Sequence, residues 1–403
     1  MISEKPAARR PGLRQVAADF GGTYAANALV GFIFAATGPV AIVLAVGTQG
    51  GLSESELSSW IFGAFFVNGL ISIAFCLAYR QPLVFFWTIP GSVLVGPALG
   101  HLSFPEVIGA FMATGVLMLA LGLSGWVKRC TEAAPMPIVM AMVAGVFLRF
   151  GIGLVHAVRD DFWIAAPMVL AFVFLSWSSI GKRLPPVLGA MSVGIVAIFF
   201  LGSFDLKGQE VLKLILPNLH APAFSWQAMI ELVVPLAITV LVVQNGQGFA
   251  VLTAAGHQPP MNAIASACGV GSIASAFTGA VSSCLTGPVN AIISSGGEKQ
   301  RHYAAGVLVG LLALVFGAFA PLFVRLLLST PPAFIAALGG LAMLRVLQTS
   351  FGVAFGGKFA LGALITFLVT VADVPIFNIG AAFWGLVIGF AISWLLERRD
   401  FKA

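Results

Sequence analysis

Long apolar runs separated by short polar intervals fill most of the chain. A helix needs ~20 apolar residues to cross the hydrocarbon core of a bilayer, and most of the runs approach that length. In the first half the predicted spans are Phe20–Val46, Trp60–Tyr79, Phe85–Gly100, Val107–Val127, Ala134–Val155, Phe162–Ile180 and Leu184–Phe204. In the second half they are Ala228–Ala250, Met261–Thr278, Gly279–Gly297, Tyr303–Leu327, Pro331–Leu347, Phe359–Ala372 and Ile376–Leu396. The pattern predicts an all-α polytopic membrane protein with fourteen transmembrane segments.

Two of these runs cannot be continuous helices. Phe85–Gly100 contains Pro90–Gly91 and Gly96–Pro97, and Gly279–Gly297 contains Gly287–Pro288. Proline is tolerated in the first turn of a helix but not in its interior, so each run is predicted to be a short extended segment followed by a half-helix. Non-helical backbone is not tolerated in contact with lipid, so both segments should line a cavity enclosed by protein.

The interrupted run is the third of seven spans in each half. Because an odd number of spans leaves the second half inverted relative to the first, the order predicts a seven-plus-seven inverted repeat, and matched interruptions are a pointer to a transporter's substrate site. The predicted parts are a cytoplasmic tail at 1–19, a first repeat at 20–204, an extracytoplasmic connecting loop at 205–225, a second repeat at 226–396 and a cytoplasmic tail at 397–403.

Composition and charge support this assignment. Hydrophobic residues make up 59% of the chain and charged residues only 9%, which excludes a soluble protein. With a cytoplasmic N-terminus, sixteen of the 21 Lys and Arg residues fall on the cytoplasmic side, as the positive-inside rule requires. The net charge of +6 therefore indicates topology and a lipid-bilayer setting rather than a nucleic-acid partner.

The two half-helix ends are the first candidate binding groups. Opposed helix N-termini place unpaired N–H groups and roughly half a positive charge each at one point, which suits an anion without a buried lysine or arginine. The alternative is that the breaks are simple kinks or packing glycines. The candidate residues at these ends are Thr88, Pro90, Gly91, Ser92, Thr286, Gly287 and Asn290.

Further polar residues interrupt two other spans. Gln244 and Asn245 lie in apolar surroundings before Gly248, and buried amides must face protein or a wet cavity. They either bind a substrate or form an interhelical hydrogen bond. Thr37 and Gly38 interrupt the first span similarly, and the Thr37 hydroxyl either faces the site or bonds back to its own helix. A wall made by Phe34, Phe86 and Trp87 is the aromatic candidate, although most phenylalanines here are expected to pack or to face lipid.

The centres of the predicted spans lack charged and titratable residues, which limits the mechanisms open to the chain. No Asp, Glu, Lys, Arg or His lies near the centre of a predicted span; Glu231 lies near a span end, and Arg149 and Arg345 are close enough to span ends to reach water. We therefore see no proton relay built on central titratable groups, no catalytic grouping and no metal-ligand spacing. We expect no enzyme activity, no cofactor and no bound metal. The four cysteines are interpreted as packing residues, and Cys284 alone has a second interpretation, as a site residue, because it lies in the second broken segment.

Short motifs then suggest a family. TIPG at Thr88–Gly91, QNGQG at Gln244–Gly248 and GPVNA at Gly287–Ala291 resemble the bacterial benzoate:proton symporter family. GLSGWVKR around Gly122–Arg129 and LRFG at Leu148–Gly151 extend the resemblance over nearly the whole chain. The resemblance implies a bacterial inner-membrane carrier with a core domain (spans 1–4 and 8–11), a gate domain (spans 5–7 and 12–14), paired short strands in spans 3 and 10, and possible homodimers.

The resemblance also implies the cargo. Nucleobase carriers of the wider group place a glutamate where this chain has Gln244, and a neutral amide suits a carboxylate ligand better than a like charge does. Benzoate or a related aromatic carboxylate, imported with a proton, is the expected substrate. The proton has two open routes, on the substrate's own carboxylate or through a water chain. The alternatives are a nucleobase or inorganic-anion carrier of the same fold and an anion channel.

Overall fold

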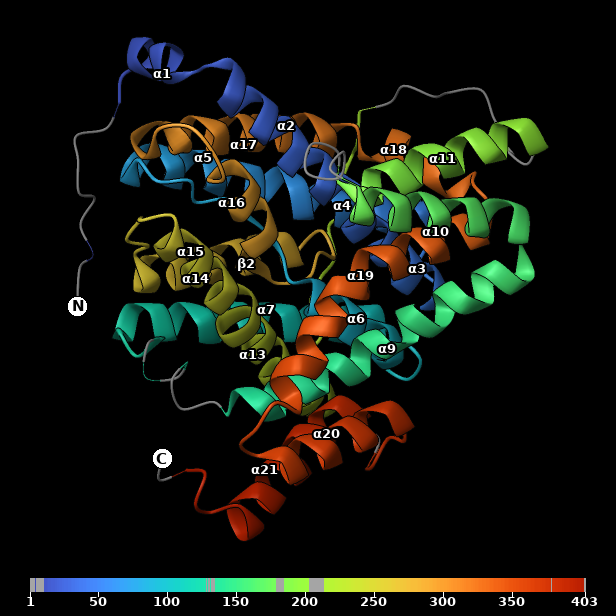
Figure 1. Cartoon of the computed structure of the whole chain (residues 1–403). Helices are drawn as coiled ribbons and strands as arrows, with labels where there is room; N and C mark the ends of the chain where they lie inside the picture. Colours follow the sequence, from blue (N-terminus) through green and yellow to red (C-terminus); the bar gives the residue numbers. More distant parts are fainter. Residues whose placement is uncertain are drawn as a thin grey trace.

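The computed structural model describes residues 4, 11–127, 129, 131, 135–178, 185–202, 214–377 and 379–401. The predicted tails at 1–19 and 397–403 and the loop at 205–225 lie partly outside these residues, and Cys130 lies wholly outside them. Figure 1 shows α5 (Asn68–Tyr79), α7 (Phe104–Ser124) and α17 (His302–Ala318) in nearly the same orientation, with α9 (Met136–Asp160) and α19 (Pro332–Ala354) inclined to them. Within the described residues, seven helical stretches are long and apolar enough to cross a bilayer, and shorter apolar helices accompany them.

Each predicted span has a counterpart. In the first repeat the elements are α1 (Leu13–Asp19), α2 (Gly22–Ala36), α3 (Gly38–Gln49), α4 (Glu54–Phe62), η1 (Gly63–Val67), α5 (Asn68–Tyr79), β1 (Phe85–Trp87), α6 (Ile89–Ala98), α7 (Phe104–Ser124), α9 (Met136–Asp160), α10 (Phe162–Trp177) and α11 (Pro186–Leu201). In the second they are α12 (Trp226–Ala228), η3 (Met229–Val233), α13 (Val234–Ile238), η4 (Thr239–Asn245), α14 (Gly246–Ala254), α15 (Met261–Ala276), β2 (Ser283–Leu285), α16 (Gly287–Ile293), η5 (Lys299–Arg301), α17 (His302–Ala318), α18 (Ala320–Leu328), α19 (Pro332–Ala354), α20 (Ala360–Ala372) and α21 (Ala381–Leu396).

The two interrupted runs are broken as predicted. Each is a three-residue strand followed by a half-helix, β1 before α6 and β2 before α16. The strands pair antiparallel, with Phe85 opposite Leu285 and Trp87 opposite Ser283. All six strand residues are buried, so the non-helical backbone is enclosed by protein, as a bilayer requires.

The helices pack as two groups. In what we call the core group, α7 packs on α15 and η3, α3 on α6, α5 on α17, and α2 on both α16 and α17. In the gate group, α9 packs on α19 and α20, α20 on α21, and α10 on α11. Between the groups, α3 contacts α19 and α6 contacts α9. The predicted residue boundaries of the core and gate domains stay predictions, and we use the two group names only for these packing partners.

Small residues allow the close approach of helices within the core group. At Gly269 on α15, a Cβ atom would lie 2.5 Å from the backbone nitrogen of Leu119 and 2.8 Å from the carbonyl oxygen of Gly115, both on α7. Such contact between backbones is the usual way in which helices associate in lipid, where apolar surface area alone gives no driving force. Substitution of this glycine would separate α7 from α15.

The predicted C-terminal end of one span was wrong. The apolar run was predicted to stop at Leu347, but α19 continues to Ala354. The polar residues Arg345, Gln348 and Thr349 look like a span end in a hydropathy pattern, yet they continue the helix as a polar stripe. Two of them, Arg345 and Thr349, line a cavity, so they do not need to reach the membrane surface.

Candidate substrate site

The two broken segments are held together by side chains from both repeats. The Ser72 hydroxyl on α5 accepts a hydrogen bond from the Phe85 N–H (2.8 Å), and the Ser272 hydroxyl on α15 accepts one from the Ser283 N–H (2.9 Å). These serines occupy corresponding places, in the second span of each repeat. The same contact between a serine hydroxyl and a strand N–H therefore occurs in both repeats, as an inverted repeat predicts.

Asn290 and Asn245 fasten the strands further. Asn290 accepts a hydrogen bond from the Val84 N–H (3.0 Å) and donates one to the Val84 carbonyl (3.1 Å). Asn245 accepts one from the Leu285 N–H (2.8 Å). Both asparagines are fully buried. Their amides therefore position the strands that lead into the two half-helices.

The N-terminus of α6 is capped by its own chain. The Thr88 hydroxyl accepts a hydrogen bond from the Gly91 N–H (3.1 Å) and also contacts the Thr239 hydroxyl (3.1 Å). The Ser92 hydroxyl and its N–H both donate to the Thr88 carbonyl. Pro90 has no N–H to offer. Thr88 and Ser92 are fully buried, so these residues complete the helix end rather than leave donors open.

The N-terminus of α16 is less completely capped. Its N-cap residue is Thr286, whose side chain makes no capping hydrogen bond, and Pro288 lacks an N–H. Within the described residues, the N–H groups of Gly287 and Val289 have no partner that caps them. Thr286 is 8% exposed. Of the two half-helices, α16 thus presents the more open end.

A small space lies between the broken segments, and we call it the inner cavity. Its volume is about 10 Å³, room for roughly one water molecule. Its lining residues are Phe34, Ala35, Pro39, Phe86, Trp87, Ile89, Gln244, Thr286 and Val289. The lining combines three aromatic rings, one amide and one hydroxyl, which is the composition of a site for a small aromatic ligand with a polar end.

Two polar groups in this lining lack partners. Gln244 is 6% exposed, and no hydrogen bond joins its amide to another described residue. The indole Nε1 of Trp87 is buried and has no hydrogen-bond partner. A buried donor without an acceptor costs about 1–3 kcal/mol, so it needs a reason. Gln244 lies in the π-helical turn η4, and such turns are frequent at functional sites.

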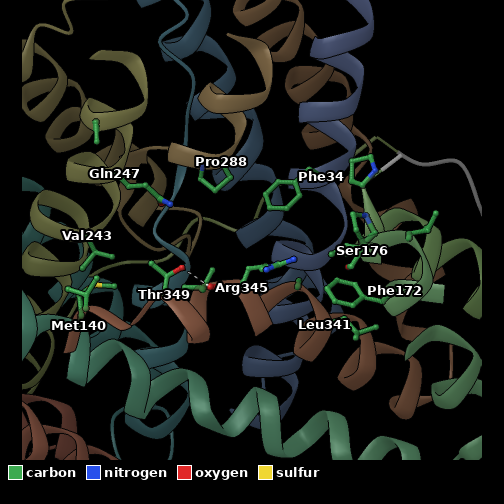
Figure 2. A pocket seen from close by; sticks show the side chains of 18 of the residues that line it. Phe34, Met140, Phe172, Ser176, Val243, Gln247, Pro288, Leu341, Arg345 and Thr349 are labelled. Atoms are coloured by element: carbon green, nitrogen blue, oxygen red, sulfur yellow. Dashed lines mark hydrogen bonds between the residues drawn. The ribbon is translucent and has the colours of Figure 1, made fainter. Parts of the chain in front are cut away.

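A much larger cavity of about 980 Å³, the vestibule, lies next to the inner cavity. Figure 2 shows Phe34, Gln247, Pro288 and Arg345 around it. Phe34 lines both cavities, so its ring stands between them. The start of α9, the end of α10 and the start of α11 also line the vestibule, and these are the ends predicted to face the cytoplasm.

The remaining predicted residues lie around this site without facing open space. The Thr37 hydroxyl donates to the Phe34 carbonyl on its own helix (3.1 Å). Gly38 lies against Ala342 of α19, where a side chain would collide. Gly248 allows α14 to approach β2, because a Cβ there would lie 2.7 Å from a methyl carbon of Leu285. Gly91 and Gly287 are similarly crowded by neighbouring side chains.

Sequence reasoning missed two vestibule residues, Arg345 and Gln247. Arg345 was assigned to a span end, yet it lies within α19 and its guanidinium bonds the Gln348 side chain (3.3 Å). Gln247 is exposed to the vestibule while Gln244, one turn earlier, is buried beside the inner cavity. The missed signal was the spacing of Arg345, Gln348 and Thr349, which places three polar residues on one stripe of a helix.

Comparison with known proteins identifies the family. The sequence pattern of the benzoate membrane transport protein family matches residues 21–395. The chain belongs to the benzoate membrane transport protein family. Two relatives are the inner membrane protein YdcO of Escherichia coli, 28% identical with 90% of this chain and 93% of that protein covered, and the benzoate membrane transport protein of Acinetobacter baylyi, 27% identical with 89% and 91% covered. Membership makes this chain a membrane transport protein, not an enzyme.

Solved structures show the same fold. The transmembrane domain of the cyanobacterial bicarbonate transporter BicA matches 90% of this chain and 97% of its own length, with a TM-score of 0.59 and 17% identity. The murine anion transporter Slc26a9 in the inward-facing state matches 99% of this chain and 74% of its own, with a TM-score of 0.63 and 15% identity. The predicted seven-plus-seven inverted-repeat fold, with spans 3 and 10 broken, is confirmed.

Proposed function

We propose that this family member imports benzoate or a related aromatic carboxylate together with a proton, by alternating access across the bacterial cytoplasmic membrane. The observation that carries this proposal is the lining of the inner cavity. Aromatic rings, a neutral amide and an uncapped helix end meet there between two broken segments. The name of the Acinetobacter baylyi relative, a benzoate membrane transport protein, supports the same substrate class.

The substrate would bind with its two ends in different surroundings. The carboxylate would accept hydrogen bonds from the Gln244 amide, the Thr286 hydroxyl and the Gly287 N–H, and from the unpartnered indole N–H of Trp87. The ring would lie against Phe34, Phe86 and Trp87. At the opposing end, Gly91 and Ser92 would contribute through the dipole of α6, because their N–H groups already have partners.

The remaining predicted residues would hold the strands and helices around the substrate in place. Asn290 and Asn245 would hold the strands, and Thr88 would complete α6. Thr37 and Gly38 would shape the break beside Phe34, and Gly248 would keep α14 close to β2. In this proposal they fix where the ligand-binding groups lie.

The two cavities suggest where the substrate goes. With room for about one water, the inner cavity cannot hold benzoate unless its lining moves. The ring of Phe34 separates it from the vestibule, so displacement of Phe34 would join the two. The vestibule opens toward the predicted cytoplasmic end, and the inward-facing state of Slc26a9 gives a related fold for such a form. Arg345 would attract the carboxylate into or out of the vestibule.

Other cargoes fit the lining less well. A nucleobase offers N–H donors, for which a carboxylate in place of Gln244 would be the better acceptor. An inorganic anion gains nothing from three aromatic rings. A channel would pass current without saturation, whereas alternating access saturates. We therefore rank the aromatic carboxylate first.

Uptake into liposomes tests the proposal directly. Purified protein with an inward proton gradient should accumulate labelled benzoate, and collapse of the gradient should abolish accumulation. Uracil, xanthine and sulfate serve as competing cargoes in the same vesicles. Uptake of none of several aromatic acids, or a non-saturating conductance in planar bilayers, would overturn the proposal.

The role of Arg345 has its own test. Arg345→Gln should raise the KM for benzoate added from the cytoplasmic face of inside-out vesicles, whereas Arg345→Lys should largely preserve it, because steering depends on charge. The exposed Lys358, in the loop after α19, provides a matched control through Lys358→Gln. If the Arg345 and Lys358 variants behave alike, Arg345 has no specific part in transport.

A further inference from the structure

A cluster of ionisable side chains closes the end of the bundle opposite the vestibule. Its centre is Glu231 in the π-helical turn η3. Glu231 is 5% exposed and is the one buried carboxylate in the described part of the chain. The sequence places it near the end of a predicted span, where a carboxylate normally reaches water.

Glu231 is held by the core group and by the gate group together. The His101 Nε2, directly after the α6 region, lies 2.8 Å from the Glu231 carboxylate. The boundary between the core group and the gate group is called the seam. Across it, the backbone N–H of Gly380, just before α21, faces the same carboxylate. The fit is so close that a Cβ at Gly380 would lie 2.6 Å from the Glu231 Oε1. Separation of the two groups must break this contact.

The seam beside Glu231 is almost filled. A cavity of about 30 Å³, room for roughly two waters, is lined by Glu231, Arg149 and Asp373 among others. Arg149 and Asp373 form an ion pair of 2.5 Å on the gate side. The helices α6, α13 and α21 carry no charged residue, and α7 carries Glu106, which accepts hydrogen bonds from Ser103. Within the described residues, the charged or titratable groups around Glu231 are therefore His101, Arg149 and Asp373.

The charge balance of this cluster depends on a single proton. Arg149 and Asp373 neutralise each other, so Glu231 and His101 must balance by themselves. With one proton bound to the pair, it is neutral; without it, the pair carries a negative charge buried beside Asp373. An uncompensated buried charge is costly, whereas the open seam would give Glu231 access to water. Proton binding and closure of this end are therefore linked.

We propose that Glu231 and His101 form a proton-binding latch at the predicted extracytoplasmic end of the transporter. A proton taken from water at that face onto the pair lets the carboxylate remain against Gly380 and keeps the seam closed. Loss of the proton to the same face leaves a buried negative charge and favours opening. The latch supplies a titratable group that the centres of the spans lack. It rests on the alternating access proposed above.

Cysteine accessibility tests the latch without substrate. In right-side-out vesicles, Ala382→Cys places a thiol in the lining of the seam cavity, and a membrane-impermeant maleimide reports opening. The three native cysteines of the described chain are buried, and the parent protein gives the background. Labelling should rise as external pH increases from about 5.5 to about 8, by at most roughly tenfold per unit for one linked proton. The exposed Asp160→Cys corrects for the reagent's own pH dependence.

Three variants separate the latch from a general effect. In Glu231→Gln, which is neutral at every pH, labelling should stay low and flat. In Gly380→Ala, labelling should be high at every pH, because the added Cβ meets the carboxylate. In Asp160→Asn, the pH profile of the Ala382→Cys protein should persist. Each of these substitutions is combined with Ala382→Cys, and a flat profile in Ala382→Cys alone, or an unchanged profile after addition of Glu231→Gln, would overturn the latch. Absence of benzoate uptake with the labelling pattern intact would instead refute only the substrate.

Discussion

Replacement of Gln244 by glutamate is the sharpest test of the inner cavity. The two side chains have nearly the same shape, so Gln244→Glu changes the charge while leaving packing almost intact. Gln244 is 6% exposed and lines the space between the broken segments. If the substrate's carboxylate binds there, the variant places two negative charges next to each other.

The magnitude follows from Coulomb's law. For two unit charges about 5 Å apart at an effective dielectric constant of about 20, the repulsion is about 3 kcal/mol. That corresponds to a loss of affinity of roughly two hundredfold, because about 1.4 kcal/mol is a factor of ten. Protonation of the new carboxyl group removes the repulsion, so activity should return as the pH falls.

The assay is benzoate binding and uptake over a pH series. Gln247→Glu is the matched control, since Gln247 is exposed to the vestibule one helical turn away. There the same charge should cost only about 1 kcal/mol, because water screens it. Equal losses in both variants, or a Gln244→Glu loss that acid does not reverse, would refute a carboxylate site at Gln244. Unchanged uptake would remove Gln244 from the site altogether.

Three further outcomes are expected. Trp87→Phe removes the unpartnered indole N–H and should weaken benzoate binding about tenfold by calorimetry; equal affinity would show that this donor does not meet the substrate. Asn290→Ala removes two buried hydrogen bonds to the segment before β1 and should lower the free energy of unfolding by about 2–4 kcal/mol. Asn68→Ala, which loses one bond within its own helix, should cost about 1 kcal/mol, and thermal unfolding that ranks the two the other way would contradict this account. Burial, together with the neighbouring His302 and Lys299, lowers the pKa of His257 from 6.5 to about 4. Because the unfolded chain then binds the proton first, thermal stability should fall as pH decreases from 6.5 to about 4, and His257→Asn should reduce that slope; an identical slope would exclude His257 as its source.

Much of the fold could be predicted because its signals are local. Apolar run lengths indicate the spans, and proline beside glycine marks the two breaks, since neither pattern depends on distant contacts. The pairing of β1 with β2 followed from the family resemblance. The end of α19 was missed because Arg345 resembles a membrane boundary in sequence, and only the vestibule explains a polar stripe inside a helix.

The site was harder to predict because partners decide the role of each polar side chain. Thr88 and Asn290 were expected to face a ligand, and their contact with a substrate stays a prediction. The structure shows their hydrogen bonds going to Gly91 and to Val84. Glu231 was interpreted as a span-end residue, because sequence does not reveal that Gly380 covers it. Such partners are far apart in the chain.

The antiparallel pair β1–β2 ties each half-helix to a strand of the other repeat. Asn290 adds a clasp of the same kind, from α16 to the residue before β1. Neither half-helix can therefore shift far without carrying its counterpart along. A substrate bound between them would therefore keep the same contacts with both half-helices on either side of the membrane. Any difference in affinity between the two sides would then originate in the gate-group surfaces past which this unit moves.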